Sequence, residues 1–369
     1  MKYYIISGES SGDLHGANLM KYIKKYDNNA TFRIWGGNLM LNEGGTLVKH
    51  YKDLAFMGFT EVITHIFTII KNFLFCIKDI VSFKPDAVIL IDYPGFNLKI
   101  AKFAKKKGFK VFYYISPQIW AWKQSRIKII RKYVDRMFVI LPFEKNFYES
   151  FDVEVDFVGH PLLDVMNDSL NNQSLNKKNE NIIAILPGSR KQEINNMLPI
   201  MLKITKNFPN KQFIVAGVSS VNNKIYDIIH KYKNVSIEYD NITNILLKAQ
   251  AAIVTSGTAT LQTALFEVPQ IVCYKGSLIS YYLAKKFIKV KYISLVNLIM
   301  NKPVIKELIQ YDFNVNNLTN LLSELLYNQQ TREQIKHNYI ELKEKLGHSG
   351  ASQKTAKLIF ERLKNSANA

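Results

Sequence analysis

A run of small residues in the second half of the chain has the composition of an anion-binding loop. Residues 251–254 form a short apolar run typical of a buried strand, and an apolar-periodic segment typical of a helix begins near residue 259. Between them lie only hydroxyl and glycine residues, Thr255, Ser256, Gly257 and Thr258. Such a loop offers free N–H groups at a helix start, where the helix dipole favours a phosphate or diphosphate. Because no P-loop lysine follows, the pattern favours a nucleotide-sugar enzyme over an NTPase.

A second candidate phosphate loop, residues 187–190, follows the apolar run 182–186. Its residues Gly188, Ser189 and Arg190 combine backbone freedom with a guanidinium that binds phosphate in a fixed geometry. An ion pair between Arg190 and Glu193 is the competing interpretation, which we rank second. With the loop at 256–258, this loop would stabilise a departing diphosphate.

Two acids follow the first predicted strand, in the sequence Gly-Glu-Ser-Ser-Gly-Asp at residues 8–13. The glycine spacing does not match the dinucleotide-binding pattern. Glu9 and Asp13 would repel a phosphate, and they suit hydrogen bonds to sugar hydroxyls or general-base catalysis. Helix capping by Ser10 or Ser11 is the alternative use of this loop.

A third acid, Asp92, directly follows the predicted strand 87–91. A carboxylate at the carboxyl end of a strand in an α/β protein points toward the ligand site. We therefore expect Asp92 to accept a hydroxyl proton, and we favour this over a turn aspartate that bonds the backbone around Pro94.

The segment 116–122, Ser-Pro-Gln-Ile-Trp-Ala-Trp, follows another predicted strand and contains two tryptophans. Trp120 and Trp122 could pack against sugar rings, although packing within a loop is the commoner use of tryptophan. Gln124 and Arg126 follow closely and could add polar contacts.

The composition narrows the function further. The net charge is +19, with basic clusters at 102–110, 123–136 and 285–291, but no nucleic-acid-binding motif accompanies it. We therefore expect no nucleic-acid partner. An anionic membrane surface or substrate would suit the clusters, although solvated helix faces explain most of the individual lysines. No Asp-x-Asp sequence occurs, and the 7 histidines have no metal-ligand spacing. We expect a reaction that uses no metal and no cofactor.

The order of the predicted elements favours two α/β domains. The strands expected at 3–7, 87–91, 111–115 and 137–141 would form a first parallel sheet, and those at 182–186, 213–216, 252–254 and 270–274 a second. Helical periodicity separates them, as in residues 97–107 and 195–208. The polar stretch 167–180 divides the chain into domains 1–166 and 167–345, and a C-terminal helix at 346–369 is expected to pack on the first domain. Two doubly wound, Rossmann-like domains that face a cleft would result.

The 2 cysteines lie in apolar runs and form no disulfide framework, so a reducing, cytoplasmic setting is expected. The start of the chain lacks the features of a signal peptide. The segment 56–83 is strongly apolar but contains charged residues, so it does not read as a membrane span. A buried helical hairpin and an interfacial or acyl-binding surface remain equal alternatives for it.

Taken together, the motifs resemble the lipid-A-disaccharide synthase family. The matching segments run in order through most of the chain: 8–13, 91–97, 116–122, 141–144, 157–160, 186–190, 256–260, 294–297 and 306–310. The resemblance implies a metal-independent, inverting glycosyltransferase of the GT-B type. Such an enzyme joins UDP-2,3-diacylglucosamine to 2,3-diacylglucosamine 1-phosphate (lipid X) and releases UDP.

The resemblance also implies roles for individual residues. Asp92 would be the general base. To this the residue types add Glu9 and Asp13 as further candidate catalytic acids, and Ser11, Trp120 and Trp122 as an acceptor wall. The donor site would comprise Gly188, Ser189, Arg190, Ser256, Gly257, Thr258, Gln262, Asn297 and Glu307. Gln262 stands where the family usually has a glutamate, and Val296 replaces a usual proline. Peripheral association with the cytoplasmic face of the inner membrane would follow, and a homodimer stays open.

Two other functions fit parts of the pattern. A different GT-B transferase or a UDP-sugar epimerase would keep the fold but would not need the apolar segment 56–83. A non-enzymatic peripheral membrane protein would not need the carboxylate of Asp92.

Overall fold

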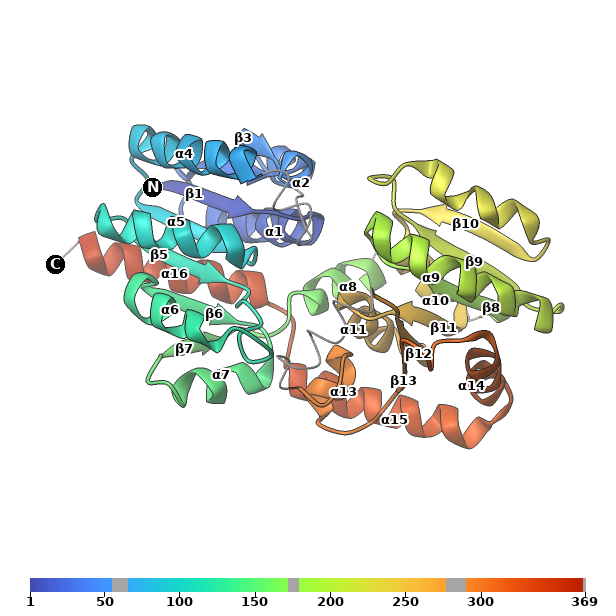
Figure 1. The fold of residues 1–369 in the computed structure, drawn as a ribbon. Helices are drawn as coiled ribbons and strands as arrows, with labels where there is room; N and C mark the ends of the chain where they lie inside the picture. Colours follow the sequence, from blue (N-terminus) through green and yellow to red (C-terminus); the bar gives the residue numbers. More distant parts are fainter. Residues whose placement is uncertain (55–65, 172–178, 277–289, 368–369) are drawn as a thin grey trace. The chain divides into compact units, whose positions relative to one another are not determined.

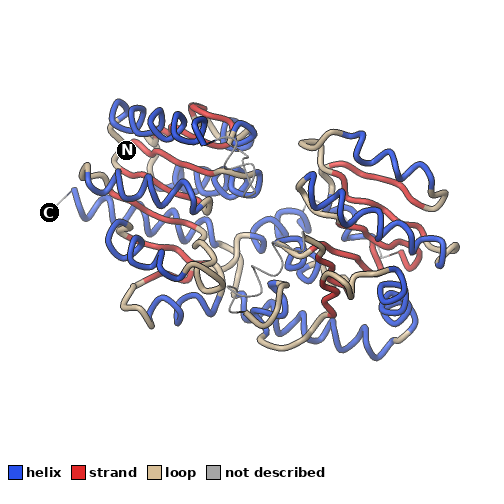
Figure 2. The backbone as a smooth tube through the Cα atoms, viewed as in Figure 1, coloured by secondary structure: helices blue, strands red, loops and turns tan. Residues whose placement is uncertain are grey.

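The computed structural model describes residues 1–54, 66–171, 179–276 and 290–367. The chain divides into two compact units (Figure 1). Unit 1 comprises Met1–Asp164 and His348–Ala369, and unit 2 comprises Val165–Gly347. Each unit contains a parallel sheet with helices along it (Figure 2).

The sheet of unit 1 has the order β3-β2-β1-β4-β5-β6-β7. Its strands are β1 (Lys2–Ser7), β2 (Thr31–Gly36), β3 (Thr46–His50), β4 (Ala87–Ile91), β5 (Lys110–Tyr114), β6 (Arg136–Val139) and β7 (Val155–Phe157). Every residue of β4 is buried, as expected for a strand covered by helices on both faces. The order reverses between β1 and β4, which makes that pair the topological switch point.

Two groups of helices cover the two faces of this sheet. One face packs against α1 (Ser10–Tyr26), α2 (Asn38–Asn42) and α16 (Ala351–Ala367), and the other packs against α4 (Ile66–Phe83), α5 (Pro94–Lys106), α6 (Ile127–Tyr133) and α7 (Pro142–Glu149). Side chains of β1 alternate between the faces: Tyr3 and Ile5 enter the first core, and Tyr4 and Ile6 enter the second.

The last helix, α16, belongs to unit 1 although the chain reaches it only after unit 2. It packs along α1, and Ser352 at its start donates its N–H to the carboxylate of Asp164 at 3.2 Å. Asp164 also accepts the N–H of Gly350. The same carboxylate lies in α8 (Leu162–Asn171), so these bonds fix the point where the chain returns to unit 1.

The sheet of unit 2 has the order β10-β9-β8-β11-β12-β13, with the switch point between β8 and β11. Its strands are β8 (Asn179–Leu186), β9 (Gln212–Gly217), β10 (Val235–Tyr239), β11 (Ala249–Thr255), β12 (Gln270–Tyr274) and β13 (Lys306–Ile309). Most of α8 also belongs to unit 2, and the α-helices that follow it in the described residues are α9 (Lys191–Lys203), α10 (Ile242–Lys248), α11 (Thr258–Leu265), α13 (Leu295–Met300), α14 (Val315–Tyr327) and α15 (Gln329–Leu346).

The predicted fold class is confirmed, since all strand pairs of both sheets are parallel. The eight predicted strands are present with small differences at their ends. The strand expected to run to residue 141 ends at Val139, because Leu141 is the N-cap residue of α7. The sequence did not single out β2, β3, β7, β10 or β13, several of which are only partly buried.

Candidate active site

The turn between β4 and α5 holds Asp92 in an unusual backbone conformation. Asp92 and Tyr93 have φ values of 44° and 48°, in a region that residues other than glycine rarely adopt. The main chain of Asp92 is anchored on both sides: its N–H donates to the carbonyl of Tyr114 at 3.2 Å, and its carbonyl accepts from the Tyr113 hydroxyl at 2.5 Å and the Asn97 amide at 2.7 Å. Backbone strain of about 1–3 kcal/mol per residue clusters at functional sites. The turn therefore aims a half-buried carboxylate from the switch point.

The loop after β1 packs against this turn. A Cβ atom on Gly8 would lie 2.4 Å from Cγ of Tyr93, so only glycine lets the two loops meet. Burial raises the pKa of Tyr93, and the nearby Glu9 carboxylate raises it further. Glu9 is thus brought to the turn that carries Asp92, while Ser11 lies exposed in the first turn of α1.

Asp13 has a different environment from the other two acids. It is buried, and its carboxylate accepts the backbone N–H groups of Gly37 at 2.7 Å, Leu39 at 3.1 Å and Met40 at 3.1 Å. These bonds satisfy the free N–H groups at the start of α2. They occupy the carboxylate, so Asp13 joins α1 to the start of α2.

The two tryptophans of the segment 116–122 also differ. Trp120 is 8% exposed, donates its Nε1–H to Glu144 at 3.2 Å and packs edge-on against Phe143. Trp122 is 44% exposed, so its ring is the accessible one of the two.

Sequence reasoning quoted Glu144 as part of a motif but gave it no role. It is buried, and it accepts the N–H groups of Ile140 at 3.1 Å and Leu141 at 2.9 Å besides that of Trp120. Burial raises its pKa to about 7. The signal that could have identified it is its position three residues after the N-cap of α7, where glutamate reaches back to the backbone.

In unit 2, the loop after β8 has the features expected of an anion site. Gly188 has φ of 110°, and the Oε2 atom of Glu193 accepts the N–H groups of Ser189 at 3.1 Å and Arg190 at 3.3 Å. Nη1 of Arg190 lies 3.3 Å from Oε1 of Glu193, so the ion pair that we ranked second is present. Both side chains retain exposure, and such a pair contributes about 0.2–1 kcal/mol, so an anionic ligand can displace it.

The loop after the neighbouring strand β11 is open. Gly257 has φ of 155° and ψ of −163°, a region adopted essentially by glycine alone, and no atom lies within 4 Å of the place where its Cβ would be. Gly257 and Thr258 are exposed at the start of α11, and half-buried Gln262 follows one turn later. Because β8 and β11 are adjacent, the two phosphate loops lie at the same edge of the sheet.

Asn297 and Glu307 form a bonded network beside this edge. Oε1 of Glu307 accepts from the hydroxyl of Ser294 at 2.7 Å and from the amide of Asn297 at 2.9 Å. Oε2 of Glu307 accepts the N–H of Ile293 at 3.0 Å, and the carbonyl of Ile293 accepts the hydroxyl of Ser256 at 2.9 Å. The network therefore fixes the wall next to the loop at 256–258.

The apolar segment 56–83 was expected to be either a buried helical hairpin or an exposed apolar surface. Its residues 56–65 lie outside the described part, and the remainder forms α4. Its inner face is held by Asp79, which accepts two bonds from Arg33 at 2.7 and 2.6 Å and one from the Tyr4 hydroxyl at 2.7 Å. Its outer face exposes large apolar side chains, Phe67, Ile70, Leu74, Phe75 and Val81. The described helix is thus buried on one side and presents an apolar surface on the other.

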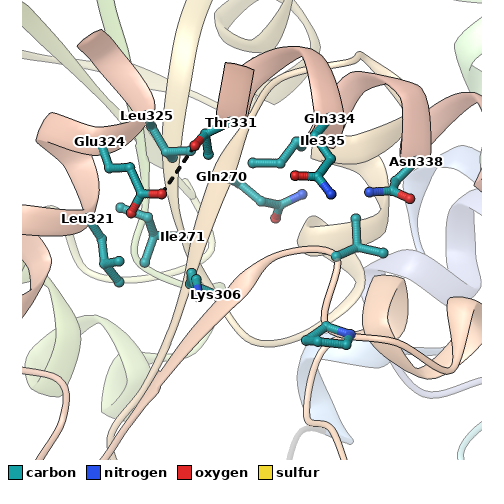
Figure 3. Close-up of a pocket in the computed structure, with 12 residues that line it drawn as sticks. Gln270, Ile271, Lys306, Leu321, Glu324, Leu325, Thr331, Gln334, Ile335 and Asn338 are labelled. Carbon is teal, nitrogen blue, oxygen red and sulfur yellow. Dashed lines mark hydrogen bonds between the residues drawn. The ribbon is translucent and has the colours of Figure 1, made fainter. Parts of the chain in front are cut away.

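A cavity of about 230 Å³ lies away from these loops in unit 2 (Figure 3). It is lined by residues at the start of β12 and β13, such as Gln270 and Lys306, and by α14 and α15. Those strand ends are opposite to the ends that carry the phosphate loops, so the cavity takes no part in the site.

The described residues contain no group of three or more histidine, cysteine, aspartate or glutamate side chains placed to hold a metal ion. Nor does any helix in that part of the chain have the length and apolar character needed to cross a membrane.

The fold is similar to that of several solved proteins, among them a UDP-GlcNAc 2-epimerase and a glycosyltransferase. UDP-GlcNAc 2-epimerase from Neisseria meningitidis bound to UDP-GlcNAc aligns with a TM-score of 0.68 at 13% identity, over 98% of this chain and 100% of that one. The S. aureus MnaA–UDP co-structure aligns with a TM-score of 0.70 at 14% identity, over 98% and 97%. Calicheamicin glycosyltransferase aligns with a TM-score of 0.62 at 12% identity, over 99% of each chain. At these identities the likeness concerns the fold alone.

The sequence comparisons are more specific. The lipid-A-disaccharide synthetase family model matches residues 3–360. Lipid-A-disaccharide synthase from Syntrophus aciditrophicus is 39% identical over 98% of both chains, and that from Coxiella burnetii strain CbuG_Q212 is 38% identical over 96% of both. Identity of this extent covers both units and every loop described above, and the chain therefore belongs to the lipid-A-disaccharide synthase family of glycosyltransferases.

Proposed function

We propose that this protein transfers a 2,3-diacylglucosaminyl group from UDP-2,3-diacylglucosamine to the 6-hydroxyl of 2,3-diacylglucosamine 1-phosphate, giving the β-1,6 disaccharide 1-phosphate and UDP. Unit 1 is the acceptor side and unit 2 the donor side. The observation that carries the proposal is the pairing of a strained carboxylate turn at one switch point with two anion-binding loops at the other.

On the acceptor side, Asp92 takes the proton of the 6-hydroxyl as its oxygen attacks C1 of the donor sugar. The bond between C1 and the diphosphate oxygen breaks, and the electron pair leaves with UDP. A single displacement of this kind inverts C1. Glu9 binds sugar hydroxyls beside the base, and Trp122 offers a ring face. Asp13 holds the start of α2 through three hydrogen bonds and does not act as a base.

On the donor side, Arg190 and the N–H groups at residues 188–190 and 256–258 stabilise the charge that develops on the diphosphate. The diphosphate replaces the Glu193 carboxylate as the partner of Arg190. Gln262 accepts a hydrogen bond from a ribose hydroxyl. Asn297 and Glu307 hold the wall of the donor pocket through their mutual bonds.

We propose that the protein associates peripherally with the cytoplasmic face of the inner membrane, where both acylated substrates would reside, and the exposed apolar face of α4 supports this location. Each methylene buried in lipid contributes about 0.8 kcal/mol. Exposed Lys71 and Lys78 on the same helix suit anionic headgroups. Replacing Phe67, Ile70 and Leu74 by serine should reduce binding to anionic vesicles, whereas unchanged binding would contradict this role.

The function is tested by incubating the purified protein with both substrates in the presence of a chelator and following the products by mass spectrometry. Disaccharide 1-phosphate and UDP in equal amounts are expected. An epimerised UDP-sugar without disaccharide, or no product from a folded protein that binds UDP, would contradict the proposal.

A further inference from the structure

Arg126 is a half-buried cation near the acceptor edge of unit 1. It ends the 3-10 helix η2 (Gln124–Arg126), directly before α6. Among the described residues its guanidinium makes no hydrogen bond or ion pair, and its one contact of note is the ring of Trp122, with Cζ 5.5 Å from the ring centroid. A partly desolvated charge without a counter-ion is costly, which is typical of a group that awaits an anionic ligand.

The side chain of Tyr113 connects Arg126 to the base. Its hydroxyl donates to the carbonyl of Asp92 at 2.5 Å, at the carboxyl ends of the adjacent strands β4 and β5. Burial raises the pKa of this hydroxyl, the Asp92 carboxylate raises it further, and the Arg126 guanidinium lowers it. Both charged groups are therefore near one hydroxyl, and Arg126 lies on the Asp92 side of the sheet.

A second cation lies in the same place. Nζ of Lys123 is 4.3 Å from the centroid of the Trp122 ring, and among the described residues it has no carboxylate partner. Two cations and an exposed indole thus form a basic surface next to the acidic turn. A phosphate attached to a sugar matches it, because the phosphate meets the cations and the sugar ring meets the indole.

We propose that Arg126, assisted by Lys123, binds the 1-phosphate of the acceptor and thereby places its 6-hydroxyl at Asp92. The inference rests on the proposed function. In a glucosamine ring, C1 and the carbon that bears C6 are both bonded to the ring oxygen. The phosphate and the reacting hydroxyl consequently flank the same edge of the sugar, and one ring can reach both groups.

The test compares acceptors with and without the 1-phosphate, in micelles of an uncharged detergent so that no lipid headgroup competes. The variant is Arg126→Gln, and the matched control is Lys99→Gln, which removes the same charge from an exposed position on α5. For Arg126→Gln we expect kcat/KM to fall about 10- to 100-fold on the phosphorylated acceptor, the scale of a lost charged hydrogen bond, and less than about threefold on the dephosphorylated one. The donor KM should not change, and Arg126→Lys should recover part of the loss.

Three results would overturn the inference. Equal losses on both acceptors would make Arg126 a structural residue, and a raised donor KM would assign it to the UDP diphosphate. A wild-type enzyme that uses both acceptors equally well would exclude a phosphate site without any variant. Failure of the proposed function would look different, since the wild type would then form no disaccharide from either acceptor.

Discussion

The two switch points have the same strand order and opposite chemistry. In unit 1, the strands on either side of the reversal deliver the carboxylates of Glu9 and Asp92. In unit 2, the equivalent strands deliver Arg190 and the open glycine loop at 256–258. The parallel topology decides where a ligand can bind, and the residues after each strand decide which ligand it is. In the proposed function, the edge in unit 1 receives the hydroxyl that is deprotonated, and the edge in unit 2 receives the diphosphate that is released.

Each edge also contains a carboxylate that binds backbone N–H groups. Asp13 does so in the buried framework of unit 1, and Glu193 does so at the surface of unit 2. Because water competes for the exposed carboxylate, Glu193 can yield its partners to a ligand, whereas Asp13 cannot without loss of stability.

The largest expected effect is that of Asp92→Asn, which removes the base and leaves the unit 2 edge intact. Turnover should fall about 10²–10⁴-fold, the scale of a lost general base. UDP affinity, measured by calorimetry, should be unchanged. Glu149→Gln, an exposed acid on α7, serves as the control. A loss of turnover below about threefold would exclude Asp92 as the base and remove the contrast between the two edges.

Arg190→Ala should affect the opposite edge. Loss of a charged hydrogen bond of about 1.5–3 kcal/mol should weaken UDP binding about 10- to 150-fold, with the acceptor KM unchanged. The neighbouring Lys191→Ala is the control, as it is exposed and begins α9. UDP affinity that resists the Arg190 change would move the diphosphate away from this loop.

Asp13→Asn should test the difference between the two carboxylates. We expect the free energy of unfolding of unit 1 to fall by about 2 kcal/mol, because a buried charged acceptor of three N–H groups is lost. Glu193→Gln should cost less than about 1 kcal/mol in unit 2. Tryptophan fluorescence during denaturation reports unit 1, since all 3 tryptophans lie there, and amide hydrogen exchange of the buried strands β8 and β11 reports unit 2. Equal losses of stability from the two changes would show that burial does not make the Asp13 carboxylate more important for stability than that of Glu193.

The smallest effect concerns acid stability of unit 1. Burial lowers the pKa of His15 to about 4 and that of His160 to about 3, with a smaller effect of His15 on the latter. Their unfolded forms take up protons near pH 6.5, so the folded unit loses stability as the pH falls below that value.

Glu144 acts in the opposite direction. Its raised pKa of about 7 means that its contribution to stability is present below its ordinary value of 4.5 and is lost as the pH rises through 7. Between pH 6 and 5 the net loss should be about 1 kcal/mol per pH unit, and Glu144→Gln should steepen it to about 2 kcal/mol per pH unit. If the unfolding free energy of Glu144→Gln, followed by fluorescence, changed with pH as in the unaltered protein, Glu144 would not offset the effect of the two histidines.

Much of the fold could be predicted because its signals are local. Strands such as β4 and β11 are continuous apolar runs, because helices cover both faces of the sheet and side chains on both faces must be apolar. The strands that were missed, such as β3 and β13, are short and partly polar, since they lie at sheet edges. Their pairing depends on a neighbouring strand that the local sequence does not reveal.

By itself the sequence determined the family, the two parallel sheets and the loops in which Asp92, Arg190 and Gly257 lie, because these depend on residue types next to one another in the chain. The tertiary structure decided which polar groups are already engaged. The partners of Asp13 lie at least 24 residues away in the chain, as does the Glu144 carboxylate that holds Trp120. Hydrogen bonds and burial between segments distant in the chain decide which polar groups support the fold, and the local sequence does not reveal these contacts.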